Sequence, residues 1–234
     1  MDREERWDSY IRENLQREKD RFTTVNSFVE EFVRILKEEK KKLVLDLGCG
    51  IGRHALYLNQ RGLEVIGYDI SSETLEIAEQ HALERKMKID FVQGDYMDLP
   101  FGNGVFDAVL SIDTLHHDFL ENIIRSFREV FRVLKPEGLF CVNLLSTSDH
   151  HFGKGRKLGE RIFVSHRIPH YFFDLEELSY ILERLNFELE SVSIDRMIHA
   201  TREEEIKREK FKIIARKKMV GKTHYVPIHN SIYW

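Results

Sequence analysis

The chain has 234 residues, a length that suits one large domain or one domain with an added segment. Its composition, 42% hydrophobic and 32% charged, is ordinary for a protein that buries a core, and the formal charge of -4 provides no overall attraction to nucleic acid or anionic lipid. The sequence contains no apolar run of the roughly 18–20 residues that a membrane span needs, and its charged start lacks the apolar stretch of a secretory signal. The two cysteines, Cys49 and Cys141, lie in apolar stretches, which indicates buried, reduced thiols and a cytoplasmic protein.

Two helices are predicted before residue 43. Residues 2–21 are heavily charged but carry a narrow apolar stripe at helical spacing that includes Trp7, Tyr10 and Ile11. A second helix is expected to be opened by Ser27, because Glu30 stands three residues later, as in a capping box, and apolar residues then recur at helical spacing. The lysines at 40–42 mark its end, since positive charge is favourable at a helix C-terminus.

From residue 43 onward, short apolar runs alternate with helical segments. The strands are predicted at 43–47, 64–68, 89–92, 105–112 and 139–145, and the helices between them at 53–60, 73–85 and 120–134. This alternation favours right-handed crossovers and a parallel sheet with helices on both faces, which is the doubly wound, Rossmann-like α/β fold. The strands are apolar almost throughout, as expected for a sheet that is buried on both sides.

The C-terminal part leaves this alternation. Asp174 and Glu177 predict a further capped helix that runs to about residue 185. Two strands are predicted after it, at 187–194 and 211–216, and the charged segment between them has no helical face, so we expect an antiparallel hairpin that completes the sheet. Residues 217–234 have no usable periodicity and are interpreted as a tail, native or added.

A glycine-rich turn follows the strand at 43–47 and carries the strongest local signal. Gly48, Gly50 and Gly52 stand at alternate positions before the next helix, so the backbone can turn sharply and approach a ligand near the positive end of a helix dipole. The spacing is G-x-G-x-G, with Arg53 where a dinucleotide-binding fingerprint has its third glycine, which disfavours NAD and FAD.

Acidic residues stand at the ends of the first three of these strands. Asp46 lies inside the end of the first strand, in position to meet a cationic group, and Asp69 closes the second, where a carboxylate accepts hydrogen bonds from a ribose diol. Asp95 follows the third strand. A glycine triplet alone is often only a tight turn, but the triplet together with these acids favours a nucleoside-binding edge.

These segments resemble the successive motifs of class I S-adenosylmethionine-dependent methyltransferases. The resemblance rests on residues 44–52, 67–69, 94–101, 106–111 and 134–138, and it extends over about residues 25–216. It implies a seven-stranded, mostly parallel sheet with an antiparallel last strand. It also implies S-adenosylmethionine as the methyl donor and S-adenosylhomocysteine as the product.

The resemblance further assigns the residues around this cofactor. The glycine turn passes under the methionine part, and Asp69 holds the ribose hydroxyls. The two residues after the third strand flank the adenine, Ile70 packs on its ring, and the residues at the end of the fourth strand lie near the sulfonium. The complete predicted set is Asp46, Gly48, Cys49, Gly50, Gly52, Asp69, Ile70, Asp95, Tyr96, Ser111 and Ile112.

The methyl acceptor is expected at the carboxyl ends of the strands, where ligands of open α/β sheets bind. Histidine pairs follow the fourth and fifth strands, and a basic, glycine-containing insert at about 146–173 resembles a lid. Two alternatives stay open: the first histidine pair is only polar packing, or the insert is only a solvated mobile loop. No metal is expected, because adjacent histidines seldom converge on one ion. The predicted catalytic residues are His117 and His150, and the predicted substrate contacts are His116, His151, Arg156, His170 and Tyr171.

The sequence thus predicts a methyltransferase domain at 43–216, helices at 1–42 that cap its active site, and a tail at 217–234. The favoured function is methyl transfer by in-line displacement to a small molecule, whose anionic charge the basic insert would bind, because the motifs look like those of tellurite-resistance and ubiquinone-biosynthesis relatives. Two alternatives stay open. One is a tRNA methyltransferase of the wobble-uridine type, favoured by residues 111–117, and the other is a protein that binds the cofactor without turnover. No membrane partner is expected.

Overall fold

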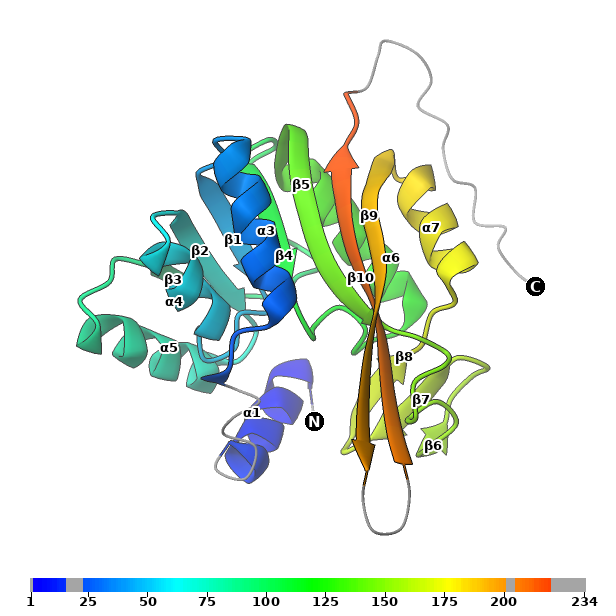
Figure 1. Ribbon diagram of the computed structural model, residues 1–234. Coiled ribbons are helices and arrows are strands. Elements are labelled where there is room, and N and C mark those ends of the chain that lie inside the picture. The colour runs from blue at the N-terminus through cyan, green and yellow to red at the C-terminus, as the bar shows by residue number, and fades with distance from the viewer. Residues whose placement is uncertain (1, 16–22, 201–204, 220–234) are drawn as a thin grey trace.

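The computed structural model describes residues 2–15, 23–200 and 205–219. Figure 1 shows a large central sheet with helices on both faces, and a smaller sheet and helix α1 at one end of it. Among the described helices, none has the length and apolar character to cross a membrane.

The central sheet has seven strands in the order β3-β2-β1-β4-β5-β10-β9. Strands β1 to β5 pair in parallel, and β10 pairs antiparallel with both β5 and β9. The predicted Rossmann-like sheet with its antiparallel last strand is therefore confirmed. The strands are β1 Leu43–Leu47, β2 Glu64–Asp69, β3 Asp90–Gln93, β4 Phe106–Ser111, β5 Leu134–Leu145, β9 Phe187–Ala200 and β10 Glu205–Lys217.

The helices cover the two faces with separate cores. Helices α3 and α4 pack on one face through an apolar cluster that includes Phe32, Leu36 and Leu58. Helices α6 and α7 pack on the other through a cluster that includes Phe127 and Leu182. The helices are α1 Arg3–Asn14, α3 Ser27–Glu38, α4 Arg53–Gln60, α5 Ser72–Glu84, α6 Leu120–Val133 and α7 Leu175–Arg184.

The helix caps agree with the sequence in one case and correct it in another. The side chain of Asp174 accepts a hydrogen bond from Glu177 N at 2.8 Å, as the capping pattern predicts for α7. The predicted Ser27 cap is wrong by one residue, since Asn26 Oδ1 accepts from Phe28 N at 2.9 Å and caps α3. Asparagine and serine are both good caps, so composition alone does not choose between neighbours.

The insert between β5 and α7 is folded into a small antiparallel sheet instead of a mobile loop. Its strands are β6 Arg156–Lys157, β7 Ile162–Ser165 and β8 Ile168–Tyr171. A backbone hydrogen bond joins it to β5 of the main sheet, because Phe173 N donates to Leu145 O at 2.8 Å, and Thr147 N donates to Phe173 O at 2.8 Å within the insert. The insert is thus part of the scaffold around the site.

The C-terminal hairpin is longer than predicted. The charged segment expected between its strands belongs to them, so β9 and β10 continue beyond the central sheet as a two-stranded extension (Figure 1). The insert fastens this extension, since His150 N donates to Lys207 O at 2.9 Å and Ser146 N donates to Glu209 O at 3.2 Å. These tertiary hydrogen bonds stabilise strand structure in a segment whose polar composition does not favour it, and no local sequence pattern reveals them.

Candidate active site

A cavity of about 1150 Å³ lies at the carboxyl ends of the parallel strands. Its walls come from the glycine turn after β1, the segments after β2, β3 and β4, helix α1, the insert and the hairpin extension. This is the edge where ligands of open α/β sheets bind, as expected from the sequence. The cavity therefore brings together parts of the chain that are far apart in sequence.

The glycine turn has a backbone shape that forms a cradle. Gly48 and Gly50 have φ values of 74° and 53°, in the left-handed region that glycine adopts most easily. Gly48 N and Cys49 N donate to Tyr68 O at 2.7 and 3.1 Å, which fixes the turn on β2. A Cβ atom added to Gly50 would find no atom within 4 Å, so the backbone there is open to a ligand.

Asp69 joins this turn to the end of β2. Its Oδ2 accepts from Gly50 N at 2.8 Å and its Oδ1 accepts from Ser71 N at 3.0 Å. Burial raises the pKa of Asp69, although these backbone donors act in the opposite direction. The carboxylate lines the cavity with lone pairs remaining, which fits the hydroxyls of a ribose.

Asp46 lies beneath the turn, at the end of β1, and does not line the cavity. It is 1% exposed, and among the described residues no donor reaches its Oδ2. Burial raises its pKa to about 7, in spite of the nearby charge of Arg53. An orphaned acceptor of this kind fits a site that receives positive charge.

The predicted adenine-side residues divide between the cavity and helix α1. Ile70 and Tyr96 line the cavity, and Tyr96 Oη donates to Asp118 Oδ2 at 2.9 Å. Asp95 does not line it, because Arg3 Nη1 binds both of its oxygens at 2.8 Å. Arg3 also pairs with Asp118 at 2.6 Å, so α1 is fastened over this end of the cavity.

Two further predicted cofactor residues lie outside the cavity and have other neighbours. Gly52, with φ 82°, starts α4, and a Cβ there would lie 3.0 Å from the Cβ of Ala78 in α5, so it permits the two helices to pack closely. The hydroxyl of Ser111 donates to Leu47 O at 2.9 Å, which joins β4 to β1. Cys49 and Ile112 do line the cavity, but Gly52 and Ser111 do not.

The first histidine pair is split between cavity and core. His117 lines the cavity, with its ring centroid 5.1 Å from that of Trp7 and 4.6 Å from that of His170. His116 lies behind it and is 2% exposed. Burial, together with the charge of Lys210, holds the pKa of His116 well below its usual value, so this ring stays neutral.

The other predicted acceptor residues are split in the same way. His151 and His170 line the cavity, whereas His150 contacts Lys154 and does not reach it. Arg156 is exposed on β6, outside the cavity. Tyr171 is buried, and its hydroxyl donates to Glu177 Oε1 at 3.1 Å.

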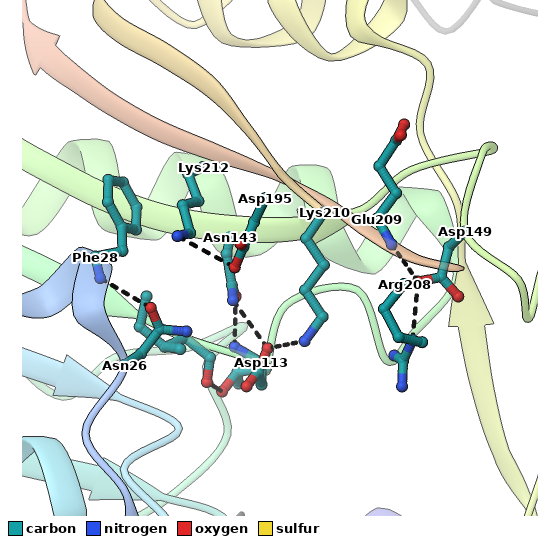
Figure 2. A network of polar contacts seen from close by, with 12 residues as sticks. Asn26, Phe28, Asp113, Asn143, Asp149, Asp195, Arg208, Glu209, Lys210 and Lys212 are labelled. Carbon is teal, nitrogen blue, oxygen red and sulfur yellow. Dashed lines mark hydrogen bonds and ion pairs between the residues drawn. The ribbon is translucent and has the colours of Figure 1, made fainter. Parts of the chain in front are cut away.

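A polar network at the ends of β4, β5 and β10 was not anticipated from the sequence (Figure 2). Asp113 accepts from Asn143 Nδ2 at 2.9 Å, lies 3.2 Å from Arg53 Nη2, and pairs with Lys210. Burial would raise the pKa of Asp113, but the charges of Lys210 and Arg53 hold it well below its usual value. The network ties the hairpin to the glycine-turn side of the cavity.

Sequence reasoning also missed Trp7, Tyr10, Arg208 and Lys210 as cavity residues. The apolar stripe of α1 and a capping role for the segment 1–42 were predicted, but the contacts of its individual side chains were not. Within the described parts of the chain, no group of three or more histidine, cysteine or acidic side chains could hold a metal ion. Both cysteines are free and buried, as predicted.

Comparison with known proteins identifies the domain. Residues 45–142 match the family model described as a methyltransferase domain. The chain is 35% identical over 133 residues to the sterol 24-C-methyltransferase of Schizosaccharomyces pombe, covering 54% of this chain and 34% of that enzyme. A solved SAM-dependent methyltransferase from Methanosarcina mazei superposes with a TM-score of 0.67 at 25% identity, over 76% of this chain and 93% of that one. TehB from Haemophilus influenzae shares the fold, with a TM-score of 0.64 at 18% identity over 84% of this chain and 63% of that one.

Residues 45–142 therefore form a methyltransferase domain, and its fold is that of the S-adenosylmethionine-dependent methyltransferases that the motifs indicated. S-adenosylmethionine is the cofactor of this class, and the open glycine turn, Asp69 and the orphaned oxygen of Asp46 fit it. The matches span 44%, 34% and 22% of three curated relatives, so the chain covers less than half of each of them.

Proposed function

We propose that this protein transfers the methyl group of S-adenosylmethionine to a small-molecule acceptor. The observation that carries the proposal is the open glycine turn joined to the Asp69 carboxylate at one end of a cavity large enough for a second ligand. S-adenosylmethionine, when bound, supplies a methyl group on a positively charged sulfur. The protein's task is then to align the acceptor and exclude water, and alignment is worth up to roughly 7–11 kcal/mol in favourable cases.

The roles proposed for individual residues follow from their positions. The backbone from Gly48 to Gly50 lies against the methionine part, with Asp46 compensating its positive charge from below. Asp69 binds the ribose hydroxyls, and Ile70 and Tyr96 contact the adenine. Cys49 and Ile112 contact the cofactor from the cavity wall.

Asp95, Gly52 and Ser111 support the cofactor site indirectly in this proposal. Asp95 fastens α1 through Arg3, Gly52 allows α4 to approach α5, and Ser111 holds β4 against β1. Helix α1, in the segment 1–42, serves as the cap that keeps water from the cofactor, because its Trp7 and Tyr10 line the cavity. A cytoplasmic location is part of the proposal and is supported by the two free, buried thiols.

Calorimetric titration with S-adenosylhomocysteine tests the cofactor site directly. Asp69→Ala is expected to weaken binding about 10–100-fold, since hydrogen bonds to a charged group are worth about 1.5–3 kcal/mol. Asp90→Ala, which removes an exposed carboxylate at the start of β3, is the matched control and should bind as the wild type does. Equal affinity of the wild type and Asp69→Ala would show that the ribose is held elsewhere.

Transfer of a tritiated methyl group then identifies the acceptor pool. A small-molecule extract and total tRNA are offered separately, and label is expected in the small-molecule fraction. Label in tRNA alone would establish the tRNA alternative. Tight cofactor binding without transfer to any pool would indicate a protein that binds the cofactor without turnover.

His117 is proposed as the residue that contacts or deprotonates the acceptor. It is the member of the His116–His117 pair that reaches the cavity. His117→Ala is expected to lower kcat about 100-fold toward the labelled acceptor, within the usual range for loss of a general base. His150→Ala, from the pair whose His151 faces the cavity, should retain near wild-type turnover because His150 does not line it. Full turnover of His117→Ala would remove this histidine from the mechanism.

A further inference from the structure

The cavity has a second half whose walls lie outside the matched methyltransferase segment, which ends at residue 142. This half is formed by the insert, the hairpin extension and helix α1. At about 1150 Å³, the whole cavity exceeds the roughly 300–1,000 Å³ usual for a single small-ligand pocket. The second half therefore has room for the acceptor beside the cofactor, and its side chains define what it accepts.

Aromatic and aliphatic side chains form most of the walls of this half. Phe163 and Phe172 of the insert, 6% and 0% exposed, pack behind this half, with ring centroids 6.0 Å apart at 72°. Met197 and Ile206 face it from the hairpin extension, and Trp7 faces it from α1. Walls of this kind favour a flat apolar body, which gains from area removed from water and from ring–ring contacts.

The hairpin extension also presents cations to this half. Residues of one face of β10, Ile206, Arg208 and Lys210, line the cavity, because side chains of a strand alternate between its faces. Lys154 of the insert adds a further positive charge. Two acids, Asp113 and Asp195, also line the cavity here. Asp113 forms ion pairs with Lys210 and Arg53. Asp195 forms one with Lys212, whose Nζ lies 3.1 Å from Asp195 Oδ2. Asp149 in turn pairs with Arg208, so among the described residues the excess positive charge comes from Lys154 and from the two cations that share Asp113.

Arg208 is oriented by a buried carboxylate. Asp149 is 3% exposed, and its Oδ2 accepts from Arg208 Nε at 3.0 Å and from Glu209 N at 2.8 Å, as Figure 2 shows. Among the described residues, no acceptor takes a hydrogen bond from either terminal nitrogen of Arg208. A guanidinium fixed through Nε offers these two donors to a carboxylate, sulfonate or phosphate group with little loss of side-chain freedom.

We propose that the acceptor is an aromatic or polycyclic molecule that carries an anionic group, and that Arg208, assisted by Lys154, binds that group. The inference rests on the proposed methyltransferase function and narrows its substrate class. Trp7 and Ile206 contact the ring system, with Phe163 and Phe172 packed behind them, and Asp149 acts as the positioning residue for Arg208. The cations come from the insert and the hairpin and the accessible aromatic ring from α1, so these three elements set the specificity.

A pair of fluorescent probes tests the proposal in the intact protein saturated with S-adenosylhomocysteine. Anilinonaphthalene sulfonate has the expected aromatic body and negative charge, and phenyl-naphthylamine has the same ring system without the charge. The sulfonate is expected to bind with one site per chain and about 10-fold or more tighter than the neutral probe, as a charge-assisted pair predicts. Equal affinity of the two probes would overturn the proposal.

Variants locate the charge that produces this preference. Arg208→Gln should remove most of the preference for the sulfonate and leave the neutral probe unaffected, and Lys154→Gln, at an exposed position, should reduce it about threefold. Arg156→Gln is the matched control, because Arg156 is an exposed cation of the same insert that does not line the cavity. A preference that survives both Arg208→Gln and Lys154→Gln would also overturn the proposal.

Failure of the proposed acceptor class and failure of the proposed methyltransferase function give different results. If S-adenosylhomocysteine binds but the sulfonate preference is missing, the methyltransferase function stands and the acceptor class is wrong. If S-adenosylhomocysteine does not bind, the proposed function itself fails. Near wild-type thermal unfolding of each variant shows that any lost preference is not a loss of folding.

Discussion

Replacing Gly48 by alanine is expected to lower the free energy of unfolding by about 2–5 kcal/mol. The residue has φ 74°, where an L side chain costs about 1–2 kcal/mol. The added Cβ would also lie 2.2, 2.3 and 2.7 Å from Cγ2, Oγ1 and Cβ of Thr114, and such overpacking typically costs about 1–3 kcal/mol. Urea unfolding of the ligand-free protein, followed by circular dichroism, measures the loss.

Gly50→Ala separates the two contributions. Gly50 has a similar φ of 53°, but a Cβ there would meet no atom within 4 Å. This control should therefore lose only the backbone contribution of about 1–2 kcal/mol. Equal losses for the two variants would mean that Thr114 moves away at no cost and that the turn is not tightly packed.

Asp46→Asn is expected to make the ligand-free protein more stable at pH 8, by at most about 4 kcal/mol, since the pKa of Asp46 rises from 3.8 to about 7 on folding and each unit is worth about 1.4 kcal/mol. The cause is burial, which disfavours the charged carboxylate, whereas asparagine has no charge to bury. Chemical unfolding of both proteins from pH 5 to pH 8 provides the comparison.

The direction of this pH dependence follows from linkage. Between the unfolded and folded pKa values, the folded state of the wild type binds more protons than the unfolded state, so its stability falls as pH rises toward 7. Over pH 5 to 7 the stability difference between the variant and the wild type should grow by about 2–3 kcal/mol, and it should level off by about pH 8. Buried histidines such as His54 and His116 titrate equally in both proteins and cancel in the difference. A difference that does not change with pH would contradict the raised pKa.

The sequence predicted most of the central sheet because its signals are local. Apolar runs of strand length, the glycine turn and the Asp174 cap each depend on a few neighbouring residues, and all appear where expected. The mostly parallel sheet of seven strands with an antiparallel last strand followed from the family resemblance and from the alternation of strands and helices. These elements form where the sequence predicts them because tertiary contacts favour the same conformations as the local strand, turn and helix preferences.

The candidate site was only partly predictable because its closure depends on distant contacts. The polar–aromatic stripe of α1 indicated a helix, but nothing local indicated that Arg3 would bind Asp95 and Asp118. The sequence pattern predicts that the charged residues before position 211 connect the two C-terminal strands. In the structure they extend β10 and place Arg208 and Lys210 in the cavity wall. Sequence periodicity also cannot tell which histidine of an adjacent pair faces the cavity, and the fold resolves this for His116 and His117.

Side chains of β10 alternate between the two faces of the strand, so the register of β10 decides which charged groups face the second half of the cavity. Ile206, Arg208 and Lys210 face inward, while Glu209, on the opposite face, hydrogen-bonds with Ser146. The ladder with β9 already shifts register between Ile214 and Ala215, so the strand accommodates an irregularity at that point. Deleting one residue between Lys210 and that point would turn the inward face outward and bring Glu209 toward the cavity. On the proposed function, losing one codon there would exchange Arg208 and Lys210 for Lys207 and Glu209 at the wall of the second half, and would so change the charge that the acceptor meets.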